Sequence, residues 1–225
     1  MNYRKLIDHT LLKADASLDA ILKLCDEAKD FGFCSVCVNP GFIKDCAARL
    51  AGSDVKVCTV IGFPLGANSS KTKLFEAKQA IKDGASEIDV VINVGKLKDK
   101  KYTYVEKELA NIVKMSQGKA LVKVIIETCL LTPDEIRKAC KIVVASGADF
   151  VKTSTGFSKY GARVEDVEIM KDTVKDRILI KASGGISDFE TMKAMINAGA
   201  SRIGTSKGTI IMEEIKQNST KVGEL

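Results

Sequence analysis

The stretch Asp149-Phe150-Val151-Lys152-Thr153-Ser154-Thr155-Gly156-Phe157 contains a short apolar strand that ends in a lysine and is followed by a loop of threonine, serine and glycine. A second stretch, Ile178-Leu179-Ile180-Lys181-Ala182-Ser183-Gly184-Gly185, repeats this order of residue types. Two consecutive units of one architecture therefore carry a lysine to the end of a strand. The repetition predicts a fold of alternating strands and helices, with a site where the strands end.

Paired lysines at strand ends indicate a specific chemistry. A lysine amine attacks a carbonyl only when it is neutral, and with a reference pKa near 10.4 only about one free lysine in 10³ is neutral at pH 7. Burial and a neighbouring ammonium both disfavour the charged form, and together they can lower a lysine pKa by roughly 3 units. The pair therefore indicates a Schiff-base site. The alternative is that each lysine caps its strand and extends its ammonium to water.

A recurring sequence pattern extends this order of helix and strand over the whole chain. A helix-like segment ends in glycine, a small residue follows, and an apolar strand begins, around Gly32, Gly84, Gly147 and Gly199. Glycine supplies the left-handed residue that ends a helix. The strands expected from this reading lie at residues 6–8, 33–38, 55–61, 87–93, 121–127, 150–152, 178–181 and 202–204.

Eight strand and helix units in 225 residues predict a (β/α)₈ barrel, with residues 1–225 as one domain. An open doubly wound sheet is the main alternative, but the chain has no G-x-G-x-x-G fingerprint. The segments between the strands have helical apolar spacing, and residues 96–117 are long enough for two helices. Thr132-Pro133-Asp134-Glu135 and Ser187-Asp188-Phe189-Glu190 are expected capping boxes at helix starts.

Composition limits the classes of function. The chain is 45% hydrophobic and 28% charged, and its net charge of +6 comes from scattered lysines without a basic block, so no nucleic-acid partner is expected. No apolar run is long enough to span a membrane, and the first residues lack the apolar core of a secretory signal. We therefore expect a cytoplasmic protein without a membrane partner, and an anionic metabolite fits the positive charge.

The cysteines and the histidine do not indicate a metal site. Seven cysteines are an odd number and lie within apolar segments, which is typical of reduced thiols. Cys34 and Cys37 have C-x-x-C spacing, but in a strand these positions point to opposite faces. His9 is the single histidine, and we expect it to be a hydrogen-bonded structural residue. Neither a metal nor another cofactor is expected.

Other strand ends carry candidate site residues. In the alternating strand Glu87–Asn93, Asp89 is expected to point into the barrel, where Lys152 or Lys181 would pair with it; a purely structural ion pair is the alternative. Lys123 and Glu127 on the next strand are either further pocket residues or structural partners. Backbone N–H groups in glycine-rich loops before a helix bind phosphate. The expected substrate-binding residues are Asp8, Thr155, Gly156, Gly184, Gly185, Gly204 and Ser206.

Four motifs in order, Ile7–Lys13, Glu87–Asn93, Val151–Phe157 and Lys181–Ile186, resemble the deoxyribose-phosphate aldolase family, and the similarity reaches from near the N-terminus to about Ser206. The resemblance implies a class I aldolase on a (β/α)₈ barrel that cleaves 2-deoxy-D-ribose 5-phosphate without a metal. It assigns the Schiff base to Lys152, the modulation of that amine to Lys181, and acid–base relay to Asp89. It also implies a homo-oligomer, a dimer or a tetramer.

The chain departs from the family pattern at three places. Members often have arginine and serine where this chain has Ser187 and Lys207, and some place a C-terminal tyrosine near the active site, whereas the tail here reads Lys221-Val222-Gly223-Glu224-Leu225. Two other functions stay open on the residues alone. These are another phosphosugar aldolase or isomerase on the same barrel, and a non-catalytic barrel that binds a metabolite.

Overall fold

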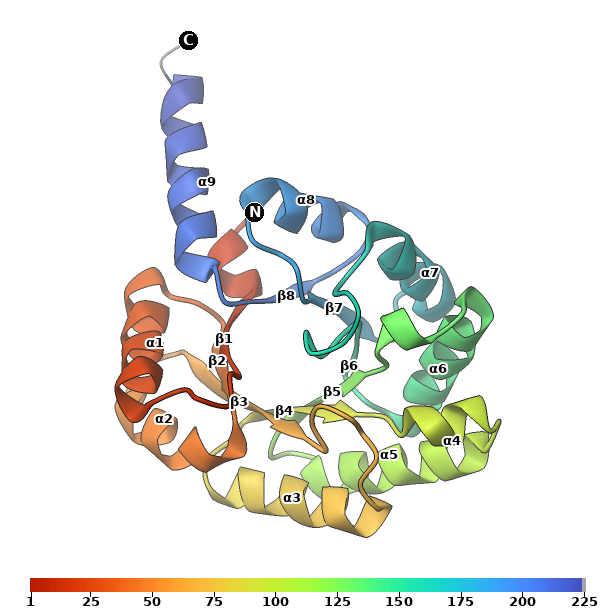
Figure 1. Ribbon diagram of the computed structural model, residues 1–225. Coiled ribbons are helices and arrows are strands. Elements are labelled where there is room, and N and C mark those ends of the chain that lie inside the picture. Colours follow the sequence, from red (N-terminus) through yellow and green to blue (C-terminus); the bar gives the residue numbers. More distant parts are fainter. Residues whose placement is uncertain (224–225) are drawn as a thin grey trace.

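The computed structural model describes the backbone of residues 1–223 and the side chains of residues 1–218. The described part excludes Glu224 and Leu225 and the side chains of residues 219–223. The side chains of the C-terminal segment that lacks a tyrosine, residues 221–225, therefore lie outside it. Eight parallel strands close into a barrel in sequence order, with β1 against β8, as Figure 1 shows. The strands are β1 (Ile7–Leu11), β2 (Ser35–Val38), β3 (Lys56–Ile61), β4 (Glu87–Val91), β5 (Leu121–Ile125), β6 (Phe150–Lys152), β7 (Leu179–Ser183) and β8 (Arg202–Thr205). The predicted (β/α)₈ barrel is confirmed.

Helices surround the barrel (Figure 1). Within residues 1–223 they are α1 (Leu18–Phe31), α2 (Ile43–Arg49), α3 (Ser70–Lys82), α4 (Val94–Lys98), α5 (Tyr102–Ser116), α6 (Pro133–Ser146), α7 (Val164–Val174), α8 (Phe189–Asn197) and α9 (Gly208–Gly223), with short 3₁₀ turns η1 (Tyr3–Leu6), η2 (Pro40–Phe42) and η3 (Thr128–Leu130). The two helices expected in residues 96–117 are α4 and α5. No helix in the described part is long and apolar enough to cross a membrane.

Alternation along the strands separates an apolar layer from a polar interior, because successive side chains of a strand point to opposite faces. Ile88, Val124 and Ile180 are buried in the main apolar core, which also contains the inner faces of the helices. Their neighbours in sequence, Asp89, Lys123 and Lys181, therefore point into the barrel and are also fully buried. The helices thus cover an apolar surface, while the barrel itself encloses charged groups.

Local signals at the helix ends agree with the fold in most cases. The four glycines of the recurring sequence pattern, Gly32, Gly84, Gly147 and Gly199, all have a positive φ, from 68° at Gly32 to 119° at Gly199. Thr132 and Glu135 form the expected capping box of α6. The second capping box was wrong: α8 begins at Phe189, and Asp188, not Ser187, accepts the hydrogen bond from the backbone N–H of Thr191. Aspartate is as strong an N-cap as serine, so the sequence allowed either start.

Two strands extend further than expected. β1 continues to Leu11, and β7 continues to Ser183, which pairs with Gly204 of β8. Ala182 and Ser183 are small and carry no apolar signal, so the pattern ended the strand too early. Lys181 is therefore the third residue of β7, one layer deeper in the barrel than a strand-end lysine.

Candidate active site

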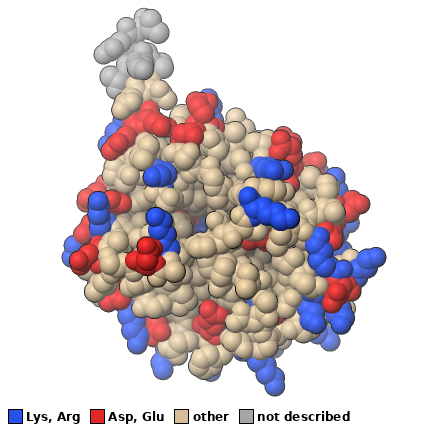
Figure 2. Space-filling view, viewed as in Figure 1, with Lys and Arg blue, Asp and Glu red and all other residues tan. Residues whose placement is uncertain are grey.

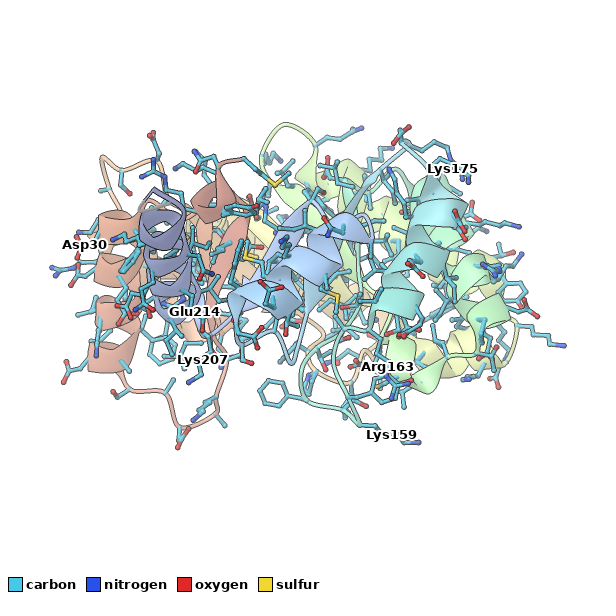
Figure 3. All side chains as sticks on the ribbon, turned by 90° about the horizontal axis from the view of Figure 1, so that it is seen from above. Asp30, Lys159, Arg163, Lys175, Lys207 and Glu214 are labelled. Atoms are coloured by element: carbon cyan, nitrogen blue, oxygen red, sulfur yellow. The ribbon has the colours of Figure 1, made fainter. Side chains whose placement is uncertain are left out.

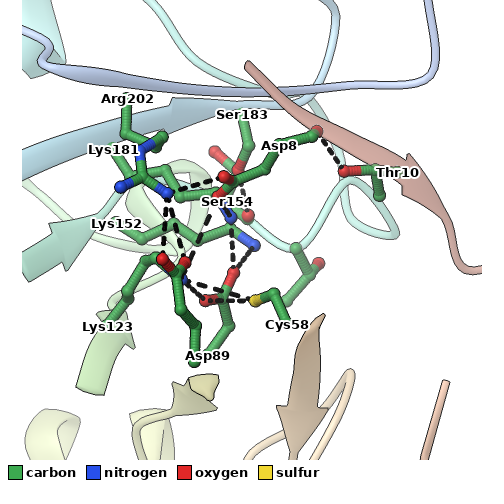
Figure 4. Close-up of polar contacts among 12 residues, drawn as sticks. Asp8, Thr10, Cys58, Asp89, Lys123, Lys152, Ser154, Lys181, Ser183 and Arg202 are labelled. Atoms are coloured by element: carbon green, nitrogen blue, oxygen red, sulfur yellow. Dashed lines mark hydrogen bonds and ion pairs between the residues drawn. The ribbon is translucent and has the colours of Figure 1, made fainter. Parts of the chain in front are cut away.

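Strand register brings the two lysines together. Lys152 of β6 and Lys181 of β7 are register partners, and both side chains point into the barrel toward Asp89 of β4. The Nζ atom of Lys152 lies 2.7 Å from Oδ2 of Asp89, and the Nζ atom of Lys181 lies 2.8 Å from the same oxygen. The two amines thus meet at one carboxylate oxygen, as Figure 4 shows.

This contact belongs to a larger buried network of charges. The second oxygen of Asp89 accepts hydrogen bonds from Lys123 at 3.0 Å and from the thiol of Cys58 at 3.2 Å. Further ion pairs join Lys181 to Asp8, Lys123 to Glu87, and Arg202 to both Asp8 and Glu87. The cations are Lys123, Lys152, Lys181 and Arg202, and the carboxylates are Asp8, Glu87 and Asp89. Four cations face three carboxylates, so one positive charge has no counterpart within the network.

The network holds most of its members in their charged forms. Burial alone would raise the pKa of Asp89, but Lys123, Lys152 and Lys181 outweigh burial and hold that pKa well below its usual range. Burial alone would lower the pKa of Lys181, but Asp8 and Asp89 outweigh it and raise that pKa. The expectation that the two ammonium groups lower each other's proton affinity is therefore wrong for Lys181. Its carboxylate partners keep it protonated across the physiological pH range.

Lys152 differs from the other lysines of the network in two ways. Among the described side chains it forms an ion pair with Asp89 alone, whereas Lys181 contacts two carboxylates and Lys123 contacts three. It also lines a cavity of about 480 Å³ at the carboxyl ends of the strands. Lys152 is therefore the cation of the network that a substrate in this cavity can reach.

Most of the expected binding residues lie around this cavity. Its lining includes Lys152 with Thr155, Gly156, Gly184, Gly185, Gly204 and Ser206, and also Lys13, Ser187 and Lys207. Asp8, Asp89 and Lys181 are fully buried and do not line the cavity. Asp8 is bound to Lys181, Arg202 and Ser35 instead, so its expected contact with the substrate stays a prediction.

The glycines of the lining serve different purposes. Gly185 has a φ of 77° with open space where a Cβ atom would stand, so its backbone is accessible from the cavity. A Cβ atom at Gly204 would stand only 2.9 Å from Cβ of Ser183 and 3.1 Å from Cε of Lys181. Gly204 therefore makes room for the Lys181 side chain, a purpose that the loop pattern alone did not indicate.

Basic side chains lie on two sides of the mouth of the barrel. Figure 2 looks onto this face and shows blue Lys and Arg side chains on both sides of the centre. In Figure 3, Lys159, Arg163 and Lys207 lie on one face of the molecule, opposite Lys175. This distribution places positive charge where an anionic substrate would enter.

Sequence reasoning missed several members of the network. Arg202 was predicted only as the first residue of a strand. Residues two apart on a strand face the same side, so Arg202 shares the inward side of Gly204 and could have been placed inside the barrel. Cys58 was read as an apolar strand residue, yet its thiol hydrogen bonds to Asp89. His9 behaves as expected, because its Nε2 atom lies 2.7 Å from a carboxylate oxygen of Glu27.

Among the described side chains, one group has the composition of a metal site. The ligand atoms of Cys37, Cys58 and Asp89 lie within 4.8 Å of one another. Three lysine ammonium groups already contact Asp89, and the Nζ atom of Lys123 is 3.4 Å from the sulfur of Cys58. A metal cation would add charge to a network that already has an excess of positive charge, so these residues do not fit a resident metal.

Comparison with known proteins places the chain in a family. Residues 4–214 match the model of the DeoC/LacD family aldolases. A deoxyribose-phosphate aldolase of Geobacillus sp. (strain WCH70) is 58% identical over 97% of this chain and 98% of its own length. The structure described as QR15, an aldolase, is 45% identical, with a TM-score of 0.92 over 96% of this chain and 97% of that chain. A tetrameric deoxyribose phosphate aldolase of Aeropyrum pernix is 33% identical, with a TM-score of 0.88 over 95% and 90% of the two chains. The chain therefore belongs to the DeoC/LacD family of aldolases.

Proposed function

We propose that this protein is a class I aldolase that reversibly cleaves 2-deoxy-D-ribose 5-phosphate to acetaldehyde and D-glyceraldehyde 3-phosphate through a Schiff base on Lys152. The observation that carries the proposal is the meeting of Lys152 and Lys181 at one oxygen of Asp89, directly below a cavity lined by phosphate-type loops. The names of the relatives, at more than half identity over nearly the whole chain, support this substrate.

Addition to a carbonyl requires Lys152 as the free amine. Loss of one proton removes the unmatched positive charge and leaves three cations facing three carboxylates. Lys152 is the member that gives up the least carboxylate contact when it becomes neutral. The free amine can then add to the C1 aldehyde, and protonation and loss of water from the adduct give an iminium ion.

The iminium drives cleavage of the C2–C3 bond. It accepts the electron pair of that bond as a base removes the proton of the C3 hydroxyl, which gives D-glyceraldehyde 3-phosphate and an enamine on Lys152. We assign this proton transfer to Asp89 acting with Lys181, through water. Because the pKa of Asp89 is held low, the carboxylate keeps a proton only briefly. The proton can therefore return to C2 of the enamine before hydrolysis releases acetaldehyde.

The phosphate would bind to the glycine-rich loops of the cavity lining. Gly184, Gly185, Gly204 and Ser206 line the cavity, and Lys207 adds a cation where relatives often have a second serine. Binding energy from the phosphate orients the scissile bond next to Lys152. Thr155 and Gly156 line the same cavity and are assigned to substrate binding.

Three wider assignments belong to the same proposal. We infer a homo-oligomer, a dimer or tetramer, which is supported by the tetrameric relative of Aeropyrum pernix. We also assign the enzyme to the cytoplasm, since its substrate is a phosphorylated metabolite. A small phosphosugar, and neither nucleic acid nor a membrane, is its proposed partner.

Trapping with borohydride tests the proposal. Reduction of the iminium during turnover of deoxyribose 5-phosphate is expected to leave a stable adduct, which peptide mass spectrometry should locate at Lys152. An adduct that forms only with another sugar phosphate would indicate a different aldolase on the same barrel. An adduct at Lys181 instead would contradict the assignment of the nucleophile, and the absence of any adduct would indicate a non-catalytic barrel.

The variant Lys181→Leu tests the assignment of proton transfer to Asp89 acting with Lys181. Lys181 donates to the oxygen of Asp89 that also accepts from Lys152, so its removal leaves this relay incomplete. We expect kcat for deoxyribose 5-phosphate to fall by about 10²–10⁴-fold, the contribution of a general acid–base group, while borohydride still traps an adduct at Lys152. An unchanged kcat would refute the assignment.

A further inference from the structure

Glu127 occupies an unusual position beside the cavity. It lies two residues after the last residue of β5, and its backbone has a φ of 54°, which is uncommon for a residue other than glycine. Its side chain is only 3% exposed, and it forms no ion pair with any cation among the described side chains. A strained backbone and a buried carboxylate without a cationic partner both cost stability. A strained backbone and an unpaired buried carboxylate at the carboxyl end of a barrel strand together indicate a functional role for this residue.

The carboxylate of Glu127 holds one residue of the loop that follows Lys152. The backbone N–H of Thr155 donates to Oε1 of Glu127 at 3.2 Å, and the hydroxyl of Thr155 donates to Oε2 at 2.5 Å. The two backbones also run side by side, because the N–H of Ile126 donates to the carbonyl of Lys152, and the N–H of Thr128 donates to that of Thr153. Glu127 thus continues the pairing of β5 and β6 above the end of the barrel.

The effect of this contact reaches the phosphate loops. The hydroxyl of Thr155 also accepts a hydrogen bond from the backbone N–H of Phe157, which sets the turn at Gly156, where φ is 85°. Gly184 in turn packs on this loop, since a Cβ atom placed on Gly184 would stand 3.5 Å from Cα of Gly156. Thr155, Gly156 and Gly184 all line the cavity. The part of the cavity wall formed by Thr155 and Gly156, against which Gly184 packs, therefore depends on where Glu127 holds Thr155.

We propose that Glu127 is a positioning residue, which fixes the loop of residues 153–157 so that the proposed phosphate loops and the Lys152 amine stand at the spacing that a phosphorylated sugar requires. This inference rests on the proposed function. It assigns Glu127 no contact with the reacting atoms. Its effect is on the selection of phosphorylated over unphosphorylated substrate.

The isosteric variants Glu127→Gln and Thr155→Val test the inference. Glutamine has one acceptor oxygen where both oxygens of Glu127 are used, and valine lacks the donor hydroxyl. For each variant we expect the ratio of kcat/KM for deoxyribose 5-phosphate to kcat/KM for deoxyribose to fall about tenfold, which corresponds to about 1.4 kcal/mol. The loss should come mainly from a higher KM for the phosphorylated sugar. The double variant should lose little more than either single variant, because the two residues act as one unit.

Glu108→Gln provides the matched control. Glu108 is also buried, at 2% exposure, but it binds Lys73 and Ser70 between α3 and α5, away from the cavity. Its substitution should lower the melting temperature and leave the substrate ratio unchanged. If Glu127→Gln and Thr155→Val likewise change only the melting temperature, Glu127 is merely structural and the inference fails. If the wild-type protein itself does not cleave deoxyribose 5-phosphate, the proposed function fails instead, so the two failures are distinguishable.

Discussion

Substitution of Lys152 by leucine is expected to abolish cleavage of deoxyribose 5-phosphate and to leave the fold intact. Removal of a covalent nucleophile lowers kcat by about 10⁶-fold in enzymes where the loss has been isolated. No neighbouring lysine can replace it, because Lys181 and Lys123 are fully buried and bound to at least two carboxylates each. Steady-state assay of acetaldehyde release measures the loss.

The Lys152→Leu variant is also expected to keep the stability of the wild-type protein. Truncation of one partner of a buried ion pair usually destabilises a protein strongly, because it leaves an unpaired charge. Here Lys152 supplies the unmatched positive charge, so its removal leaves three cations facing three carboxylates. We therefore expect the free energy of unfolding of Lys152→Leu to stay within about 1 kcal/mol of the wild-type value.

Lys107→Leu serves as the control for both measurements. Lys107 is exposed on α5 and does not line the cavity, so its substitution should change neither activity nor stability appreciably. Measurable turnover by Lys152→Leu through an adduct on another lysine would overturn the assignment of the Schiff base. A large loss of stability would contradict the charge count of the network.

The sequence predicted the fold because its signals are local. The positive-φ glycines after the helices and the short apolar strands each depend on neighbouring residues, and together they determine the repeat and the closure of the barrel. The cavity lining was predictable for a similar reason, since strand ends of a barrel converge. The predicted ends of several strands were wrong. β1 and β7 continue past their expected ends, because small and polar residues extend a strand without an apolar signal. β4 and β5 end at Val91 and Ile125, two residues earlier than expected.

The electrostatics of the site were not predictable from local patterns. The direction of the Lys181 pKa shift depends on Asp8, which lies at the other end of the chain and meets Lys181 only when β1 closes against β8. Likewise, the need for glycine at position 204 follows from the path of the Lys181 side chain. Charge counts across a closed barrel require the register of all eight strands, which periodicity alone does not give.

Substitution of Asp89 by asparagine is expected to separate formation of the imine from cleavage of the carbon–carbon bond. Loss of this carboxylate removes the ion-pair partner of Lys152 and leaves the amine itself in place. Borohydride should therefore still trap an adduct at Lys152. Turnover should nevertheless fall by about 10²–10⁴-fold, the contribution of a general acid–base group, because no carboxylate remains beside the amine to receive the C3 hydroxyl proton.

Glu87→Gln distinguishes this role from a purely structural one. Glu87 binds Lys123 and Arg202 in the same network but makes no ion pair with Lys152, so its substitution removes the same charge from a different place. Both variants should lose about 3–5 kcal/mol of unfolding free energy, as expected when a buried ion pair is broken, and urea unfolding measures that loss. If the two variants also lose equal amounts of kcat, Asp89 acts through stability alone. A loss of at least tenfold more kcat in Asp89→Asn, with the adduct retained, requires Asp89 in the proton transfer that follows imine formation.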